Sequence, residues 1–114
     1  MKEIKLKIDK RFETKFIIKK ELELDSDIKR NLITKQFKSG SKTTYFYMYE
    51  EYYKRTNSDL TVTLFVLETP DFTEIEMYSS GGGVGISSSS FGSEAASLKT
   101  FKKLFIEEGF YVVE

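Results

Sequence analysis

The chain of 114 residues contains no cysteine and no histidine. Without cysteine there is no disulfide, no thiolate nucleophile and no cysteine-based metal site. Without histidine, the commonest general base and the commonest metal ligand of proteins are both absent. Zinc chemistry and Ser-His-Asp catalysis are therefore excluded. An enzyme of this composition would have to work with carboxylates, lysines, tyrosines or a borrowed cofactor.

Long apolar runs are also missing from the chain. No segment approaches the ~18 residues that a membrane-spanning helix needs. The first residues alternate charged and apolar side chains, whereas a signal peptide needs a continuous apolar stretch. We therefore expect a cytoplasmic protein that does not engage a membrane, folded as one α+β domain over residues 1–114.

Charge of one sign is not in excess either. The 18 basic residues are balanced by 18 acidic ones. Nucleic-acid binding rests largely on cationic contacts to phosphate, so the balance argues against a nucleic-acid partner. No spacing of a known nucleotide-binding fingerprint is present, and we expect no cofactor.

Period-two alternation is the clearest pattern that the chain does contain, and it predicts β-strands. The first strand is carried by Ile4, Leu6 and Ile8. Three further alternating runs, separated by short turns, are typical of an antiparallel meander. They cover residues 43–53, 60–67 and 72–78, and short strands are also expected over 86–91 and 110–113.

Two segments have helical spacing. Ile28, Leu32, Ile33 and Phe37 form one stripe of a 3.6-residue period, with Asp25 or Ser26 as N-cap and Gly40 beyond the end. A second helix is predicted from Ser93, as N-cap, to about Glu108, with Gly109 as its stop. Residues 15–24 fit a strand, although a helix over 10–21 fits as well. These elements predict a two-layer α+β sandwich, a mainly antiparallel sheet of five to six strands with two helices on one face.

The order of motifs from Tyr45 onward resembles a family of small, uncharacterised bacterial proteins. An aromatic strand ending in Tyr-Glu-Glu-Tyr-Tyr is followed by an alternating strand and then by a strand that runs into Ser-Ser-Gly-Gly-Gly at 79–83. A Phe-Gly-Ser-Glu segment at 91–94 opens the last helix. The resemblance covers roughly the C-terminal 70 residues and implies a two-layer α+β domain. It implies no activity and no site residues.

A glycine-rich segment joins the last long strand to the last helix. It contains Gly81, Gly82, Gly83, Gly85 and Gly92. Such a loop before a helix presents backbone amides that can bind an anion, with Ser93 at the helix start. Glu94 in the first turn would repel that anion. We therefore favour a structural role, in which glycine allows a bulge or a close crossing of the backbone.

A tyrosine stripe on the strand over 43–53 is the second candidate site. Tyr45, Tyr47 and Tyr49 share one face of the strand, and tyrosine is enriched at protein interfaces. If this face is uncovered, we expect it to bind a protein partner or a second copy of the chain. The alternative is that these rings are half-buried strand residues with no partner.

Carboxylates are the last candidate. Glu74 and Glu76 share a strand face about 6–7 Å apart along the strand, a separation also found in glycosidases, but glutamates on a solvated face give the same pattern. We therefore expect a small non-catalytic binding or interaction domain, with self-association as one form of it. The alternative is a small-ligand or anion-binding protein that uses residues 81–94, and an enzyme based on carboxylates is third.

Overall fold

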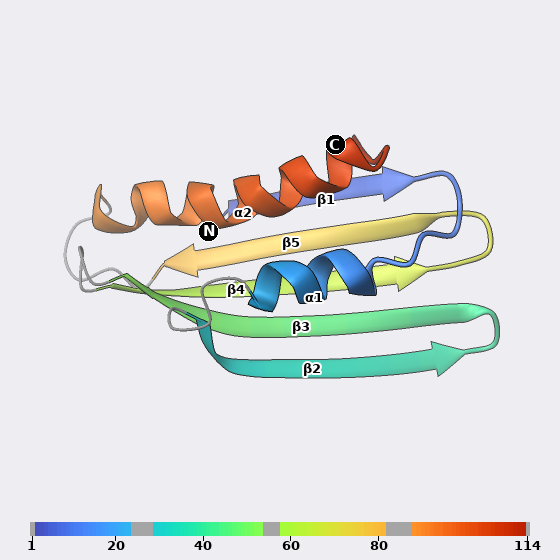
Figure 1. Ribbon diagram of the computed structural model, residues 1–114, viewed down its shortest axis with the longest axis horizontal. Coiled ribbons are helices and arrows are strands. Elements are labelled where there is room, and N and C mark those ends of the chain that lie inside the picture. The colour runs from blue at the N-terminus through green and yellow to red at the C-terminus, as the bar shows by residue number, and fades with distance from the viewer. Residues whose placement is uncertain (1, 24–28, 54–57, 82–87, 114) are drawn as a thin grey trace.

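The computed structural model describes residues 2–23, 29–53, 58–81 and 88–113, and Figure 1 shows their arrangement. The elements follow in the order β1 (Lys2–Ile8), α1 (Lys15–Glu23), β2 (Lys29–Ser39), β3 (Lys42–Tyr53), β4 (Ser58–Glu68), β5 (Thr73–Gly81), α2 (Ser88–Glu107) and β6 (Tyr111–Val112).

The strands form one antiparallel sheet in the order β2-β3-β4-β5-β1-β6. Strands β2 to β5 are a meander, as the alternation predicts. β1 lies beside β5, with Leu6 opposite Ile75. Both helices lie on the same side of the sheet, α2 against β5, β1 and β4, and α1 beside α2. The predicted two-layer α+β sandwich is therefore confirmed.

The core lies between the helices and one sheet face. Register places the apolar residues of β1, β3, β4 and β5 on that face, for example Tyr47 opposite Leu64 and Leu64 opposite Met77. The helices contribute four buried side chains that cover this sheet face, namely Ile18, Leu98, Phe101 and Phe105. Each fully buried large side chain of this kind contributes roughly 1.5–3 kcal/mol through removal of apolar area from water.

The connection from β1 to α1 is held by side chains of the last residue of β4 and the first residue of β5. The hydroxyl of Thr73 donates to the carbonyl of Lys10 at 3.0 Å and accepts from the amide of Phe12 at 2.8 Å. The amide of Thr14 donates to Glu68 Oε1 at 3.2 Å. These bonds fix the point at which α1 begins, because its first free amides need partners outside the helix.

The helix predicted over residues 28–37 is wrong. This segment is β2, the edge strand of the sheet. Its pairing with β3 shifts between Arg30 and Ile33, so a β-bulge interrupts the period-two alternation just where Leu32 and Ile33 follow one another. Residues 32–40 are exposed, and an edge strand without a buried face needs no alternation. Asp25 and Ser26, the predicted caps, lie outside the described residues.

The helix alternative for the segment after Thr14 is right in type, because α1 covers Lys15–Glu23, and the strand alternative over 15–24 is wrong. The strand over 86–91 is also wrong where it can be judged, because Ser88–Phe91 belong to α2. Gly109 does end α2, with φ at 108° and a hydrogen bond of 3.1 Å from the Phe110 amide to the Phe105 carbonyl. Gly40 also has a positive φ, at 61°, but it lies in the turn of the β2–β3 hairpin and does not follow a helix. The two-residue turns that are favoured in hairpins need a positive φ at this position.

Candidate functional site

The tyrosine stripe of β3 faces the helices. Tyr47 and Tyr49 are buried, and Tyr45 packs half-buried at the margin of the core. Burial raises the pKa of Tyr45, and the adjacent Glu68 carboxylate, which accepts its hydrogen bond, raises it further. The face is therefore covered at Tyr47 and Tyr49, so the condition under which we expect a partner there is not met by these two rings.

The glycine-rich segment is described only at its two ends. Gly81 is the last residue of β5, and Ser93 lies within α2, five residues after its start at Ser88. Ser93 is therefore not the predicted N-cap, and it lies away from the helix start that the alternative anion site would use. Gly82, Gly83 and Gly85 lie outside the described residues, so the structural interpretation of these glycines stays a prediction.

The carboxylates are dispersed over both sheet faces. Glu68 is buried on the side of the helices, whereas Glu74 and Glu76 lie on the opposite side, beside Lys7 and Lys5 of β1. Glu76 is engaged with Lys5 at 3.9 Å and with the hydroxyl of Tyr78, which donates to its Oε2 at 2.9 Å. Glu74 and Glu76 both line a hollow of about 190 Å³ beside Lys5, and the Glu76 carboxylate there is already paired with Lys5.

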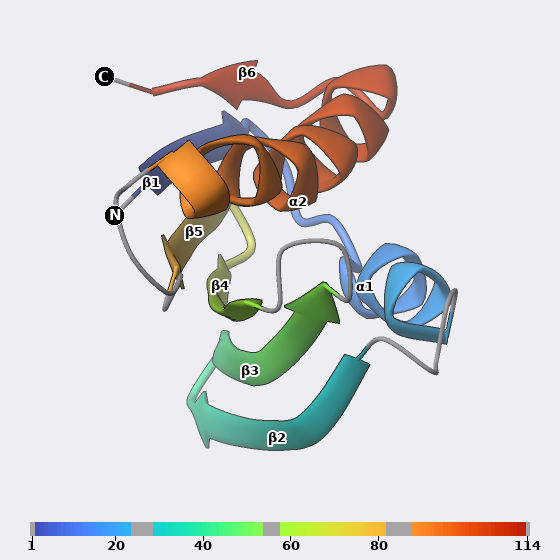
Figure 2. The ribbon, with the colours of Figure 1, turned by 90° about the vertical axis from the view of Figure 1, so that its left-hand side faces the viewer.

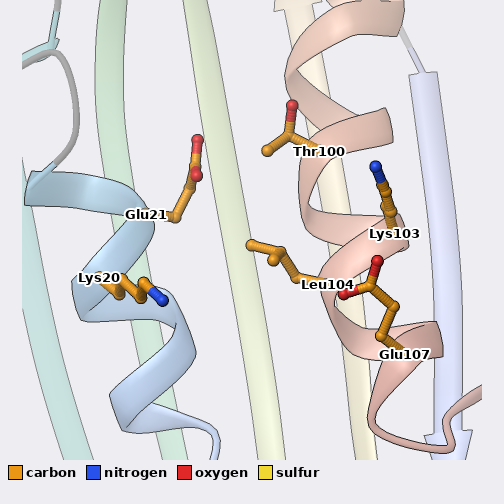
Figure 3. Close-up of a pocket in the computed structure, with 6 residues that line it drawn as sticks. All are labelled: Lys20, Glu21, Thr100, Lys103, Leu104 and Glu107. Carbon is orange, nitrogen blue, oxygen red and sulfur yellow. The ribbon is translucent and has the colours of Figure 1, made fainter.

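A groove of about 320 Å³ lies between the two helices, and Figure 3 shows the side chains around it. Lys20 and Glu21 come from α1, while Thr100, Lys103, Leu104 and Glu107 come from α2. This volume is at the lower limit of ligand sites. The lining has two cations and two carboxylates around one leucine, so it offers no excess charge to select a ligand.

The sheet face opposite the helices, which we call the open sheet face, carries an apolar cluster. Among the described elements, none lies on this side (Figure 2). The rings of Phe46 and Phe65 meet edge to face at 5.0 Å between centroids, and Phe65 meets Tyr78 in the same way at 6.3 Å. Phe65 is 41% exposed.

The apolar cluster continues onto the edge strand. Register places Ile33 beside Met48, and Phe37 on the same face two rows along, beside Thr44. Ile33 is 41% and Phe37 60% exposed. The cluster therefore covers β2, β3 and β4, and its apolar members are Ile33, Phe37, Phe46, Met48, Phe65 and Leu67.

The other half of the open sheet face is polar. On β1 and β5 it carries Lys5, Glu3 and Glu76, with Lys5 within 3.7 Å of Glu3 and within 3.9 Å of Glu76. Lys7 lies over the ring of Phe72, 4.8 Å from its centroid. Protein interfaces commonly combine an apolar centre with a polar rim, and this face has the same arrangement.

Sequence reasoning missed this surface because β3 is aromatic on both faces. The deciding signal is the β3–β4 register, in which odd-numbered residues of β3 oppose even-numbered residues of β4. The even positions of β4 are Leu60, Val62, Leu64 and Val66, and their continuous apolar character marks them as buried. The tyrosines that pair with them are buried too, and Phe46 is left on the open side.

Comparison with protein-family models, with curated proteins and with solved structures gives no match. The resemblance to a bacterial family therefore stays an expectation. Within the described residues, no helix has both the length and the apolar character to span a membrane. The same part of the chain holds no cluster of three acidic groups suited to a metal ion.

Proposed function

We propose that the chain is a cytoplasmic, non-catalytic protein-interaction domain that binds its partner through the open sheet face at β2, β3 and β4. The observation that carries the proposal is the apolar cluster around Phe65, which no described element covers. Monomeric proteins rarely leave large contiguous apolar patches in water unless the patch has a partner.

The surroundings of the cluster support the same function. The ion pairs of Lys5 with Glu3 and Glu76 keep the β1–β5 half of the face charged and hydrated. A partner that covers the cluster would leave these charges at the rim, where their desolvation is small. The balanced total charge supports a protein partner over a nucleic acid, because the latter draws its affinity from neutralised phosphates.

Affinity capture from a cell extract tests this function with matched variants. Phe65→Asp places a charge in the centre of the cluster, and Phe16→Asp makes the same change on α1, where the side chain is 79% exposed. We expect the wild type and Phe16→Asp to retain the same protein and Phe65→Asp to lose it, with all three equally folded by circular dichroism. Equal retention by all three variants would contradict the proposal.

Light scattering separates a foreign partner from self-association. A purified chain that stays at 13.3 kDa at high concentration needs a partner of different sequence. A mass of twice this value that Phe65→Asp returns to 13.3 kDa would make the chain its own partner.

A further inference from the structure

Strand β2 is an open edge of the sheet. It is the terminal strand in the order and has 11 residues, whereas β6 at the opposite edge has two. An edge strand presents unpaired backbone N–H and C=O groups along its outer side, and these can pair with another extended chain. Figure 1 shows β2 along the margin of the sheet, away from both helices.

The beginning of β2 is irregular in a way that hinders pairing with another strand, but the rest of the strand is regular. The bulge between Arg30 and Ile33 disturbs its beginning. From Ile33 to Ser39 the pairing with β3 is continuous, and this stretch contains no proline and no glycine. Seven consecutive residues are therefore available as a template for an added strand.

The side chains of this stretch differ between the two faces. On the open sheet face the sequence is Ile33, Lys35 and Phe37, and on the other face it is Thr34, Gln36 and Lys38. Three of the eight exposed large apolar side chains in the described part of the chain lie on β2. An added strand would thus meet two apolar side chains with a lysine between them.

Charge decides which strand fits. β2 carries four basic residues and no acidic one. Two β2 strands could pair antiparallel so that Ile33 of each copy lies opposite Phe37 of the other. In this register the two copies of Lys35 would lie opposite each other. Like charges directly opposite destabilise a strand pair, so the edge disfavours a second copy and favours an acidic strand.

We infer that β2 binds an extended acidic segment of another protein by strand addition, with the pattern apolar, polar, acidic, polar, apolar. The inference rests on the proposed interaction function and names the chemistry of its partner. Backbone hydrogen bonds supply affinity in this binding mode, and alternate side chains supply specificity. The acidic residue lies opposite Lys35, and the flanking apolar residues lie opposite Ile33 and Phe37.

The probe is a labelled peptide, Glu-Val-Thr-Glu-Thr-Val, acetylated and amidated at its ends, and its control has lysine in place of the central glutamate. Fluorescence polarisation should show saturable binding of the acidic peptide and weaker binding at higher salt, because exposed charges are screened. Lys35→Glu should weaken binding by at least about fivefold and should restore binding to the lysine peptide. Lys99→Glu, the same change at an exposed position of α2, should leave both affinities unchanged.

The backbone contribution has its own test. Two N-methylated peptides are compared, one methylated at the odd-numbered amides and one at the even-numbered amides. One of them should lose binding and the other should keep it, because only every second amide faces the edge strand. NMR shifts on peptide addition should centre on the amides of residues 33–39. Equal effects of both methylated sets, or shifts centred away from β2, would overturn strand addition.

Three outcomes would overturn this inference while the proposed function keeps its own test. No binding of the acidic peptide to the wild type at concentrations up to about 1 mM overturns the edge proposal, and the Phe65→Asp capture still decides the function. β2 amide shifts that grow with protein concentration, without peptide, would show that a second copy takes the edge, and would overturn the acidic partner. Equal binding of the acidic and lysine peptides would do the same.

Discussion

The backbone amide of Thr14 donates a hydrogen bond of 3.2 Å to Oε1 of Glu68, 54 residues further along the chain. Glu68 is 4% exposed and also accepts a hydrogen bond from Tyr45. One buried carboxylate thus joins the start of α1 to the end of β4 and the side of β3. A charge-assisted bond of this kind is stronger than a neutral one.

Glu68→Ala should therefore destabilise the fold strongly. The substitution leaves the Thr14 amide and the Tyr45 hydroxyl without their acceptor, and we expect a loss of about 2–3 kcal/mol in the free energy of unfolding. Glu68→Gln, which keeps one oxygen acceptor, should lose less. Urea denaturation measures both, with Glu108→Ala, an exposed residue directly after α2, as a control that stays within about 0.5 kcal/mol. A loss of that small size for Glu68→Ala would show that the carboxylate does not hold α1.

The packing of α2 is tested at Phe101. This ring is 1% exposed and stacks with Phe105 at 6.4 Å. Phe101→Ala should cost about 3–5 kcal/mol, because it removes apolar contacts and leaves a cavity. Ile106→Ala, on the outer side of the same helix and 42% exposed, should cost under about 1 kcal/mol. Similar losses for both variants in chemical denaturation would mean that the buried side of α2 is wrongly assigned.

The two glycines with positive φ in the described part of the chain should respond differently to asparagine. Gly40 has φ at 61°, within the left-handed region that asparagine tolerates, and a side chain there would meet open space. Gly109 has φ at 108°, outside that region. Alanine should cost about 1 kcal/mol or more at both sites. Asparagine should recover most of the loss at residue 40 and little at residue 109, as judged by thermal unfolding. Full recovery at both sites would mean that backbone strain is not what selects glycine at residue 109.

The sequence was informative wherever one face of an element is buried. The alternation in β1, β4 and β5 predicts strands because the core requires every second residue to be apolar. The pattern failed at β2, where Leu32, Ile33 and Phe37 are all exposed and a bulge breaks the alternation, so their spacing matched a helix by coincidence. The open sheet face could not be assigned from the sequence, because it depends on the β3–β4 register and on the pairing of β1 with β5 across about 70 residues.

The ionisation of Tyr78, which can be followed by absorbance, reports on the polar margin of the open sheet face. Its hydrogen bond to Glu76, followed by partial burial, raises its pKa from 10.0 to about 12. The raised pKa means that the folded state keeps this proton when the unfolded state has lost it. The stability contributed by Tyr78 is therefore complete below pH 10.0 and is lost as the pH rises towards about 12.

Titration of tyrosinate absorbance measures this directly. The difference between the wild type and Tyr78→Phe should titrate near pH 12, and Glu76→Gln should move that step down towards 10.0, because the charged acceptor is replaced by a neutral one. Glu74→Gln, one row away on the same strand face, should leave the step almost in place. Unfolding experiments should show that Tyr78→Phe loses less stability than the wild type between pH 10 and about pH 12. A step near 10.0 in the wild type would mean that Tyr78 and Glu76 are not hydrogen-bonded in solution and that the charged margin of the open sheet face is looser than its ion pairs indicate.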